Sequence, residues 1–369
     1  MKSSVSILSL VLLLGAVLGI ESIGDENNTI PNDGLYGNWA IRMPCGASGW
    51  LTIKKVDGVS QGELWTLGGG KKLLDLDIDG GLECSFSRMI RVGKPEYPGG
   101  PPTGKRLKIY HVGVLENGRL RIKYSLPDGS NVRYEAKRIK RLPTRPNLDL
   151  LKFGKPVTLF NGTDLQGWTL ANLDKKNGWQ VSDGELRNST TKTDFSAYGS
   201  YGNLQTLANF TDFNLKIDFK VPKGGNSGIY LRGLYEVQVV DRDSRMQGIQ
   251  GVGSVFGRIP ASKNSGNPGG EWNSYDITLV DRHVTVILND EKVIDNQPIE
   301  GCTNGALIPD DSMPGPIYLQ GDHTSVAYRN IVLTPILPAN RESSKIAVME
   351  TAFNKRADGS SFEDARKAG

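Results

Sequence analysis

Apolar and polar residues alternate at nearly every second position over most of this chain, in short runs that end at glycine, asparagine or aspartate. A two-residue period is typical of antiparallel β-strands that bury one face. Tight hairpin turns are favoured at Asp57-Gly58, Asn117-Gly118, Asp128-Gly129, Asp281-Arg282 and Asn289-Asp290. Helical periodicity is nearly absent before the last thirty or so residues. The pattern therefore predicts an all-β protein.

The periodic runs form two groups on either side of a linker at 142–149, where prolines and polar residues interrupt the pattern. The first group, within 35–141, comprises runs at 38–42, 50–56, 63–67, 82–91, 107–114, 120–124 and 132–138. It predicts a small antiparallel β-barrel or sandwich with an accessory or binding role. The second group, within 150–338, comprises runs at 215–221, 229–231, 235–240, 275–280, 283–288, 317–320 and 327–335. It predicts a larger β-sandwich of the jelly-roll type.

The two ends of the chain depart from this pattern. Residues 1–20 combine Lys2 with an uncharged apolar stretch and small residues, which is typical of a signal peptide. We therefore expect a secreted or periplasmic protein without a membrane span after cleavage, and an uncleaved anchor is the alternative. The polar segments 21–34 and 339–369 are expected to be flexible.

Cysteine content and charge add two constraints. Three cysteines fit neither a disulfide scaffold nor a zinc site, and a pairing of Cys45 with Cys84 is left open. From Ile30 to Arg145 there are 20 Lys and Arg against 11 Asp and Glu. The surplus lies mainly at 105–108 and 137–141. In an exported protein such a surface would contact an anionic polysaccharide rather than nucleic acid, although solvated strand faces also explain it.

The stretch GGNSGIYLRGLYEVQVVD, from Gly224 to Asp241, predicts two strands joined by a glycine turn. Because strand side chains alternate between faces, Arg232, Glu236 and Gln238 can gather on one sheet face. Asp241 lies five positions after Glu236, so a β-bulge would be needed to turn it to that face. An arginine, acids and amides around one turn indicate a sugar-binding or carboxylate-based catalytic site. A solvated strand face is the alternative.

Further motifs accompany this stretch in a fixed order between about 150 and 337. They are LFNGTDLQGW at 159–168, Trp179 with DGEL at 183–186, GNLQT at 202–206, DFNL at 212–215, GGNSGIYLR at 224–232, YEVQVVD at 235–241, GEWN at 270–273, LQ at 319–320, His323 and YRNI at 328–331. This set resembles the 3-keto-disaccharide hydrolase family. The resemblance does not extend to the first group of strands.

The resemblance implies a concanavalin A-like jelly roll with a sugar cleft on the concave face of one sheet. It also implies a glycoside or oligosaccharide substrate already oxidised to a ketone at C3 of one sugar. A base removes the acidified C2 proton, the enolate expels the glycosidic oxygen from C1, and water adds to the resulting enone. This route needs a base, a group that stabilises the enolate oxygen and an acid for the leaving group.

Each role has a candidate residue. His323 is the first choice of general base or metal ligand, because histidine titrates near neutral pH. Arg232 is expected to stabilise the enolate or to pair with Glu236. Glu236 and Asp241 are expected to act as acid and base, or to bind a divalent metal ion together with His323. Substrate contacts are expected from Asn226, Tyr230, Gln238, Glu271, Trp272 and Gln320.

Two other function classes remain open. The spacing Glu236-x-Gln238-x-x-Asp241 resembles the Glu-x-Asp-x-x-Glu signature of retaining glucanases, with an amide in place of the middle acid. A non-catalytic carbohydrate-binding module would keep the aromatic and amide contacts without needing the acids or His323. The clustered acids favour an enzyme, and the ordered motifs favour the 3-keto-glycoside reaction.

Overall fold

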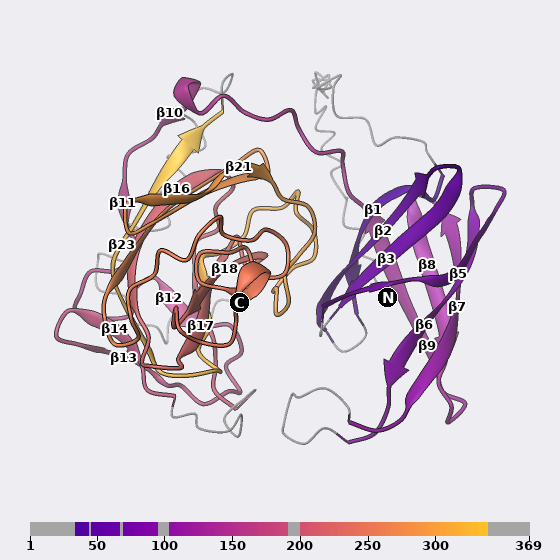
Figure 1. Ribbon diagram of the computed structural model, residues 1–369, viewed down its shortest axis with the longest axis horizontal. Coiled ribbons are helices and arrows are strands. Elements are labelled where there is room, and N and C mark those ends of the chain that lie inside the picture. The colour runs from indigo at the N-terminus through magenta and orange to yellow at the C-terminus, as the bar shows by residue number, and fades with distance from the viewer. Residues whose placement is uncertain (1–33, 44–45, 67–68, 95–102, 191–199, 339–369) are drawn as a thin grey trace, which may run out of the picture.

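The computed structural model describes residues 34–43, 46–66, 69–94, 103–190 and 200–338 (Figure 1). The expected signal peptide, most of 21–34, Cys45 and the tail at 339–369 lie outside these ranges. Two β units are formed, which we call the barrel (34–141) and the sandwich (148–337). The only helices in the described ranges are two single 3-10 turns, η1 (Leu148–Leu150) and η2 (Gly248–Gln250). The all-β prediction is confirmed.

The barrel contains nine strands in an up-and-down order. They are β1 (Gly37–Arg42), β2 (Ser48–Val56), β3 (Val59–Thr66), β4 (Gly69–Lys72), β5 (Leu74–Asp79), β6 (Glu83–Arg91), β7 (Arg106–Glu116), β8 (Arg119–Ser125) and β9 (Asn131–Arg138). Each pairs antiparallel with the next, except that β4 and β5 are consecutive halves of one bent segment. Because β4 pairs with β3, β5 with β6, and β9 with β1, the ring is closed. Of the two predicted alternatives, the structure is a barrel.

Alternating side chains of these strands fill the barrel interior. Trp39, Leu51, Phe86 and Leu120 are almost fully buried in one apolar cluster. Cys84 belongs to the same cluster as a free thiol, and burial raises its pKa to about 11. Cys84 therefore forms no disulfide and is not poised to react as a thiolate.

The sandwich consists of two antiparallel sheets. The larger one contains β13 (Trp179–Ser182), β14 (Glu185–Asn188), β23 (Val326–Leu337), β16 (Phe213–Lys220), β19 (Asn273–Val280), β20 (His283–Leu288) and β21 (Glu291–Pro298), with the short β10 (Lys152–Phe153) and β11 (Val157–Thr158) also paired to β23. The smaller one has the order β12 (Trp168–Leu170), β15 (Leu204–Thr206), β22 (Tyr318–Leu319), β17 (Asn226–Leu231) and β18 (Tyr235–Val240). Facing side chains such as Ile229, Val237, Ile217 and Ile277 form one continuous core. The predicted sandwich is confirmed.

The barrel contacts the sandwich through an apolar patch and several polar links. Trp50 and Trp65 of the barrel belong to the same buried cluster as the sandwich core. The Arg258 guanidinium lies 3.9 Å from the Trp65 ring centre and donates to the Cys302 carbonyl at 2.7 Å. Arg42 donates to the Leu307 carbonyl at 2.8 Å. The barrel therefore rests on two loops of the sandwich, one between β18 and β19 and one between β21 and β22.

None of the helices in the described ranges is long and apolar enough to cross a membrane.

Candidate functional site

Strand register places a row of polar side chains across the smaller sheet. Gln205 of β15 lies opposite Tyr318 of β22, Tyr318 opposite Tyr230 of β17, and Tyr230 opposite Glu236 of β18. Residues directly opposite each other in antiparallel strands point to the same face. Two positions along the strands, Gln238 lies opposite Gly228, whose carbonyl accepts from the Gln320 backbone N–H at 2.9 Å. We call this surface, made of Gln205, Tyr230, Glu236, Gln238, Tyr318 and Gln320, the polar face.

Glu236 is the central acid of the polar face. Its side chain is only 4% exposed. Burial raises the pKa of Glu236 to about 8, against the effect of a hydrogen bond with Tyr230, and the Asp322 carboxylate raises it further. Gly228 provides the space for this carboxyl, because a Cβ there would lie 2.3 Å from Glu236 Oε1. Glu236 is therefore mostly protonated at neutral pH and can donate a proton.

The two tyrosines of the row are held in place by neighbouring loops. The Tyr230 hydroxyl donates to the Asn304 carbonyl at 2.6 Å, and its ring packs edge-on against Tyr318. Asn203 donates to the Tyr318 hydroxyl at 2.5 Å and accepts from the Gly321 N–H at 2.6 Å. Sequence reasoning missed Tyr318, Asn203 and Asn304. Two of them had a signal: Asn203 lies in the GNLQT motif at 202–206, and Tyr318 precedes Gln320 by two positions in a predicted strand.

Four amide oxygens at or beside the polar face have no hydrogen-bond partner within the described residues. They are Asn226 Oδ1, Gln238 Oε1, Asn304 Oδ1 and Gln320 Oε1. The amide nitrogen of Gln238, by contrast, donates to the Gln250 carbonyl at 3.1 Å. Buried acceptors without a donor are costly in a folded protein and are concentrated here. They are suited to accept hydrogen bonds from sugar hydroxyls.

His323 lies just beyond β22, next to a carboxylate. Its Nδ1 is 2.7 Å from Asp322 Oδ1, and both side chains are about one-sixth exposed. In the tautomer that donates from Nδ1 to this carboxylate, Nε2 is the nitrogen that can accept a proton. The preceding Gly321 carbonyl accepts from Asn188 at 2.9 Å and from the Thr190 hydroxyl at 2.6 Å, which fixes this link. Asp322 was not among the predicted site residues.

Two of the predicted catalytic residues bind backbone groups away from Glu236. Arg232 has φ of +58° in the β17–β18 turn and donates to the Asp311 and Met313 carbonyls, both at 2.5 Å. The β17–β18 register is regular through Val240, so the bulge that would bring Asp241 to the polar face is absent. Burial would raise the pKa of Asp241, but N–H donors from Gly224, Asp243 and Gly269 outweigh it and lower the pKa.

Two predicted substrate-binding residues also lie elsewhere. Trp272 precedes β19 on the outer side of the larger sheet, between Lys220 and Arg329, whose cationic groups lie 4.5 and 4.0 Å from its ring centre. Its neighbour Glu271 is exposed. Within the described ranges, no three His, Cys, Asp or Glu side chains lie close enough together to hold a metal ion. A divalent metal ion bound by Glu236, Asp241 and His323 is therefore not supported by their placement, and a chelator is needed to test it.

One protein family matches most of the sandwich. The profile of a family described as the 3-keto-alpha-glucoside-1,2-lyase-like domain matches residues 155–334. Residues 155–334 of this chain belong to that family. A 3-keto-disaccharide hydrolase from Bacteroides thetaiotaomicron is 28% identical in an alignment 166 residues long that covers 38% of this chain. The match spans 57% of that relative's length.

Solved structures give a consistent but weaker likeness. A protein from Parabacteroides distasonis assigned to the glycosyl hydrolases is 24% identical, with a TM-score of 0.41 over 50% of this chain and 94% of its own. A laminarinase from Flavobacterium sp. UMI-01 is 12% identical, with a TM-score of 0.30 over 50% of this chain and 100% of its own. The fold described above rests on strand pairing and burial rather than on these low scores.

Proposed function

We propose that the sandwich cleaves glycosidic bonds of 3-keto-glycosides or 3-keto-disaccharides by elimination followed by hydration. The observation that carries the proposal is a buried, protonated Glu236 on the same sheet face as unpaired amide oxygens, next to the His323–Asp322 pair. Family membership of residues 155–334 supports the substrate class. The apolar stretch in 1–20 supports secretion to the periplasm or the exterior.

In the elimination half, His323 Nε2 takes the C2 proton, which the C3 ketone makes acidic. The electron pair of the C2–H bond forms the enolate, and the C1–O bond to the leaving sugar then breaks. Glu236 gives its proton to the departing oxygen. Asp322, bound to His323 Nδ1, stabilises the imidazolium that results.

In the hydration half, the Glu236 carboxylate takes a proton from water as the oxygen adds to C1 of the enone. The His323 imidazolium returns a proton to C2, which restores both residues and completes a net hydrolysis. The enolate oxygen requires a donor, and the Gln238 and Gln320 amides lie on the polar face with Glu236. Tyr318 and Tyr230 pack edge-on against each other beside Glu236 and hold this part of the polar face in place.

The test is cleavage of matched disaccharides, plain and 3-keto, by the purified protein with and without a chelator. We expect 3-ketoglucose from the oxidised substrate only, and loss of about 100-fold or more in kcat for His323→Gln, the usual share of a general base. Cleavage of the plain disaccharide would instead identify a retaining glucanase. Sugar binding without cleavage of either would identify a binding module. Loss of activity with chelator would establish a metal requirement.

A further inference from the structure

The structure separates the two basic clusters of the barrel sequence. In the 137–141 cluster, Lys137 forms an ion pair with Asp310 of the sandwich at 2.5 Å. Arg138 is buried against the Trp39 ring and donates to the Tyr36 carbonyl at 2.6 Å. The Lys140 and Arg141 carbonyls accept from Arg282. This cluster is used in building the barrel and its contact with the sandwich.

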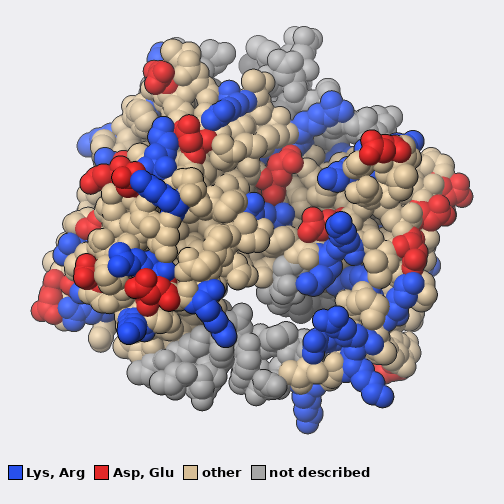
Figure 2. Space-filling model, in the orientation of Figure 1, with Lys and Arg blue, Asp and Glu red and all other residues tan. Residues whose placement is uncertain are grey.

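The other cluster lies on the outer face of β6 to β9. Arg91, Arg106, Lys108, Lys123 and Arg133 all point outward there and are exposed. Within the described ranges only Lys108 has an acidic partner, Asp75 at 2.7 Å. We call these five residues the basic strip. Figure 2 shows Lys and Arg side chains gathered over the lower part of the barrel, where β6 ends and β7 begins in Figure 1.

Strand register brings like charges of the basic strip directly together. Arg91 of β6 lies opposite Arg106 of β7, and Lys123 of β8 lies opposite Arg133 of β9. Like charges that face each other across an antiparallel pair destabilise the sheet. By contrast, Arg121 on the same face is paired with Glu116 at 2.7 Å and Glu135 at 3.1 Å. Two facing pairs of cations, Arg91 with Arg106 and Lys123 with Arg133, thus lack, within the described residues, the acidic partners that Arg121 has.

An apolar hollow and an exposed ring accompany these cations. A depression of about 440 Å³ is lined by Val112 and Val114, with Lys123 and Arg133 at one end and the paired Arg121, Glu116 and Glu135 at the other. Tyr110, two positions before Val112 on the same face, is 65% exposed, and the Lys108 ammonium lies 5.4 Å from its ring centre. From Val112 to Arg106 the strip runs about 20 Å along β7 at the rise of an extended strand.

We infer that the basic strip binds an anionic polysaccharide. The aliphatic floor and single aromatic ring fit the apolar faces of sugar rings, and the cations fit repeated carboxylates along a linear chain. Single-stranded nucleic acid is bound on several stacking aromatics in series, and the strip offers one. The face is distinct from β1 to β3, which carry the tryptophans that pack against the sandwich. The barrel would therefore hold the enzyme on a polymer without covering the polar face.

The test is binding of the full-length protein to polygalacturonate by calorimetry at low and at physiological salt. Lys123→Gln with Arg133→Gln is expected to weaken binding about tenfold or more and to flatten its salt dependence, since two charge-assisted contacts are lost. The matched control, Lys54→Gln with Lys55→Gln, removes two exposed lysines from β2 and should stay within about twofold of wild type. Hydrolytic activity on a small disaccharide should be unchanged in both.

A second readout separates a binding role from an ordinary solvated face. Without ligand, Arg133→Gln should raise Tm, because the repulsion with Lys123 is relieved. Loss of binding together with higher Tm supports the inference. Equal weakening by the control pair, tighter binding to DNA or to phosphatidylserine vesicles than to polygalacturonate, or no binding at low salt would overturn it.

Discussion

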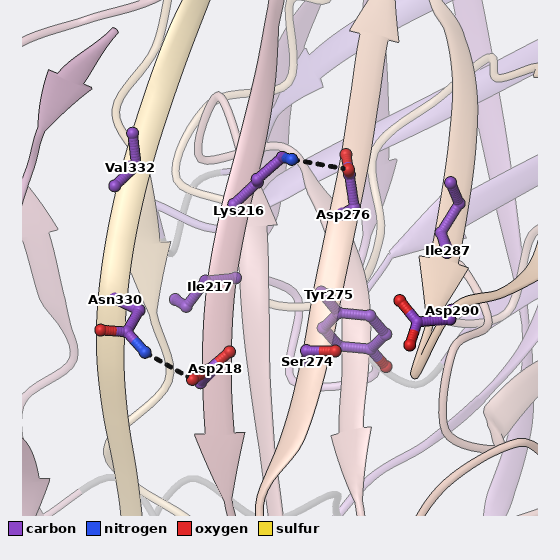
Figure 3. A pocket seen from close by; sticks show the side chains of 10 residues that line it. All are labelled: Lys216, Ile217, Asp218, Ser274, Tyr275, Asp276, Ile287, Asp290, Asn330 and Val332. Atoms are coloured by element: carbon purple, nitrogen blue, oxygen red, sulfur yellow. Dashed lines mark hydrogen bonds and ion pairs between the residues drawn. The ribbon is translucent and has the colours of Figure 1, made fainter.

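The sandwich has two polar surfaces with the same two-residue period. The side chains of one are paired and partly exposed, whereas those of the other are buried and partly unpaired. On the outer face of the larger sheet, Lys216 pairs with Asp276 at 3.4 Å, and Asn330 donates to Asp218 at 2.7 Å (Figure 3). Arg329 also pairs with Asp218, at 3.2 Å. A hollow of about 400 Å³ on this face is lined by Lys216, Asp218, Asp276 and Asn330, which remain partly exposed. The outer face is satisfied by its own residues and by solvent.

On the polar face of the smaller sheet, by contrast, the polar side chains are buried and several lack a partner among the described residues. Glu236 is buried without an ion pair to any described residue, its pKa is raised to about 8, and amide oxygens around it are unpaired. Burying an acid and unsatisfied acceptors destabilises the folded protein. Such groups are typical of binding and catalytic sites, where they interact with the ligand. The two surfaces therefore differ in their unsatisfied buried polar groups, and a hollow alone does not distinguish them.

The difference between the two faces is tested most strongly by exchanging one carboxyl for an amide on each face. Glu236→Gln is expected to lower kcat on a 3-keto disaccharide by about 10²- to 10⁴-fold, because an amide cannot deliver a proton. Asp218→Asn, the matched change on the outer face, should leave kcat within about twofold. Comparable losses from both variants, or from neither, would contradict the assignment of the site.

A second prediction concerns stability rather than activity. The pKa of Glu236 is about 8 in the folded protein and near 4.5 when unfolded, so the native state holds an extra proton between these values. Stability should therefore fall as pH rises from about 4.5 to 8, by up to about 4 kcal/mol from this group. Glu236→Gln should be more stable than wild type at pH 9 and about equal at pH 4. Urea unfolding at both pH values measures the difference, and a gap that does not grow with pH would refute it.

Gly228 offers a smaller perturbation of the same acid. In Gly228→Ala the new Cβ would lie 2.3 Å from Glu236 Oε1, so the carboxyl must move. We expect about a tenfold loss in kcat, because misplacing a catalytic group by a fraction of an ångström is costly. Gly224→Ala, where a Cβ meets no atom within 4 Å, is the control for altered backbone. Its φ of +70° makes it the more strained substitution, so unchanged kcat there would isolate the effect on Glu236.

The smallest effect is expected at Trp272. Its ring lies between Lys220 and Arg329 on the outer face, so Trp272→Ala should cost about 1–2 kcal/mol of stability and change KM by less than about twofold. The measurement is KM for a 3-keto disaccharide in wild type and in Trp272→Ala. A rise of tenfold or more with intact folding would place Trp272 in the substrate site after all.

The longer strands followed from the sequence because their alternation was uninterrupted. The runs predicted at 235–240 and 283–288 coincide with β18 and β20. The strand β5 was missed although Leu74 to Asp79 alternates, since its outward positions are all aspartates and no turn separates it from β4. β21 was missed because Asn296 and Pro298 are atypical of strands. Short strands such as β10 to β12 have too few residues for a period to be read.

The site was predicted in part, for reasons that lie in the backbone. Glu236, Gln238 and Tyr230 share the polar face because period and register determine it. Arg232 leaves that face because it occupies the turn with positive φ, and Asp241 leaves it because it follows the strand's end. Asn304 and Asp322 come from loops whose path depends on long-range packing. Such contacts cannot be predicted from the alternation of apolar and polar residues along the chain.

The most direct test of the account is an NMR titration of the Glu236 carboxyl in protein labelled with ¹³C-glutamate, assigned by comparison with Glu236→Gln. We predict one carboxyl resonance, missing in the variant, that titrates with a midpoint near pH 8 and shifts when a 3-keto disaccharide binds. A Glu236 resonance that titrates near 4.5 and ignores the sugar would contradict the claim that this buried acid is the proton donor of the site.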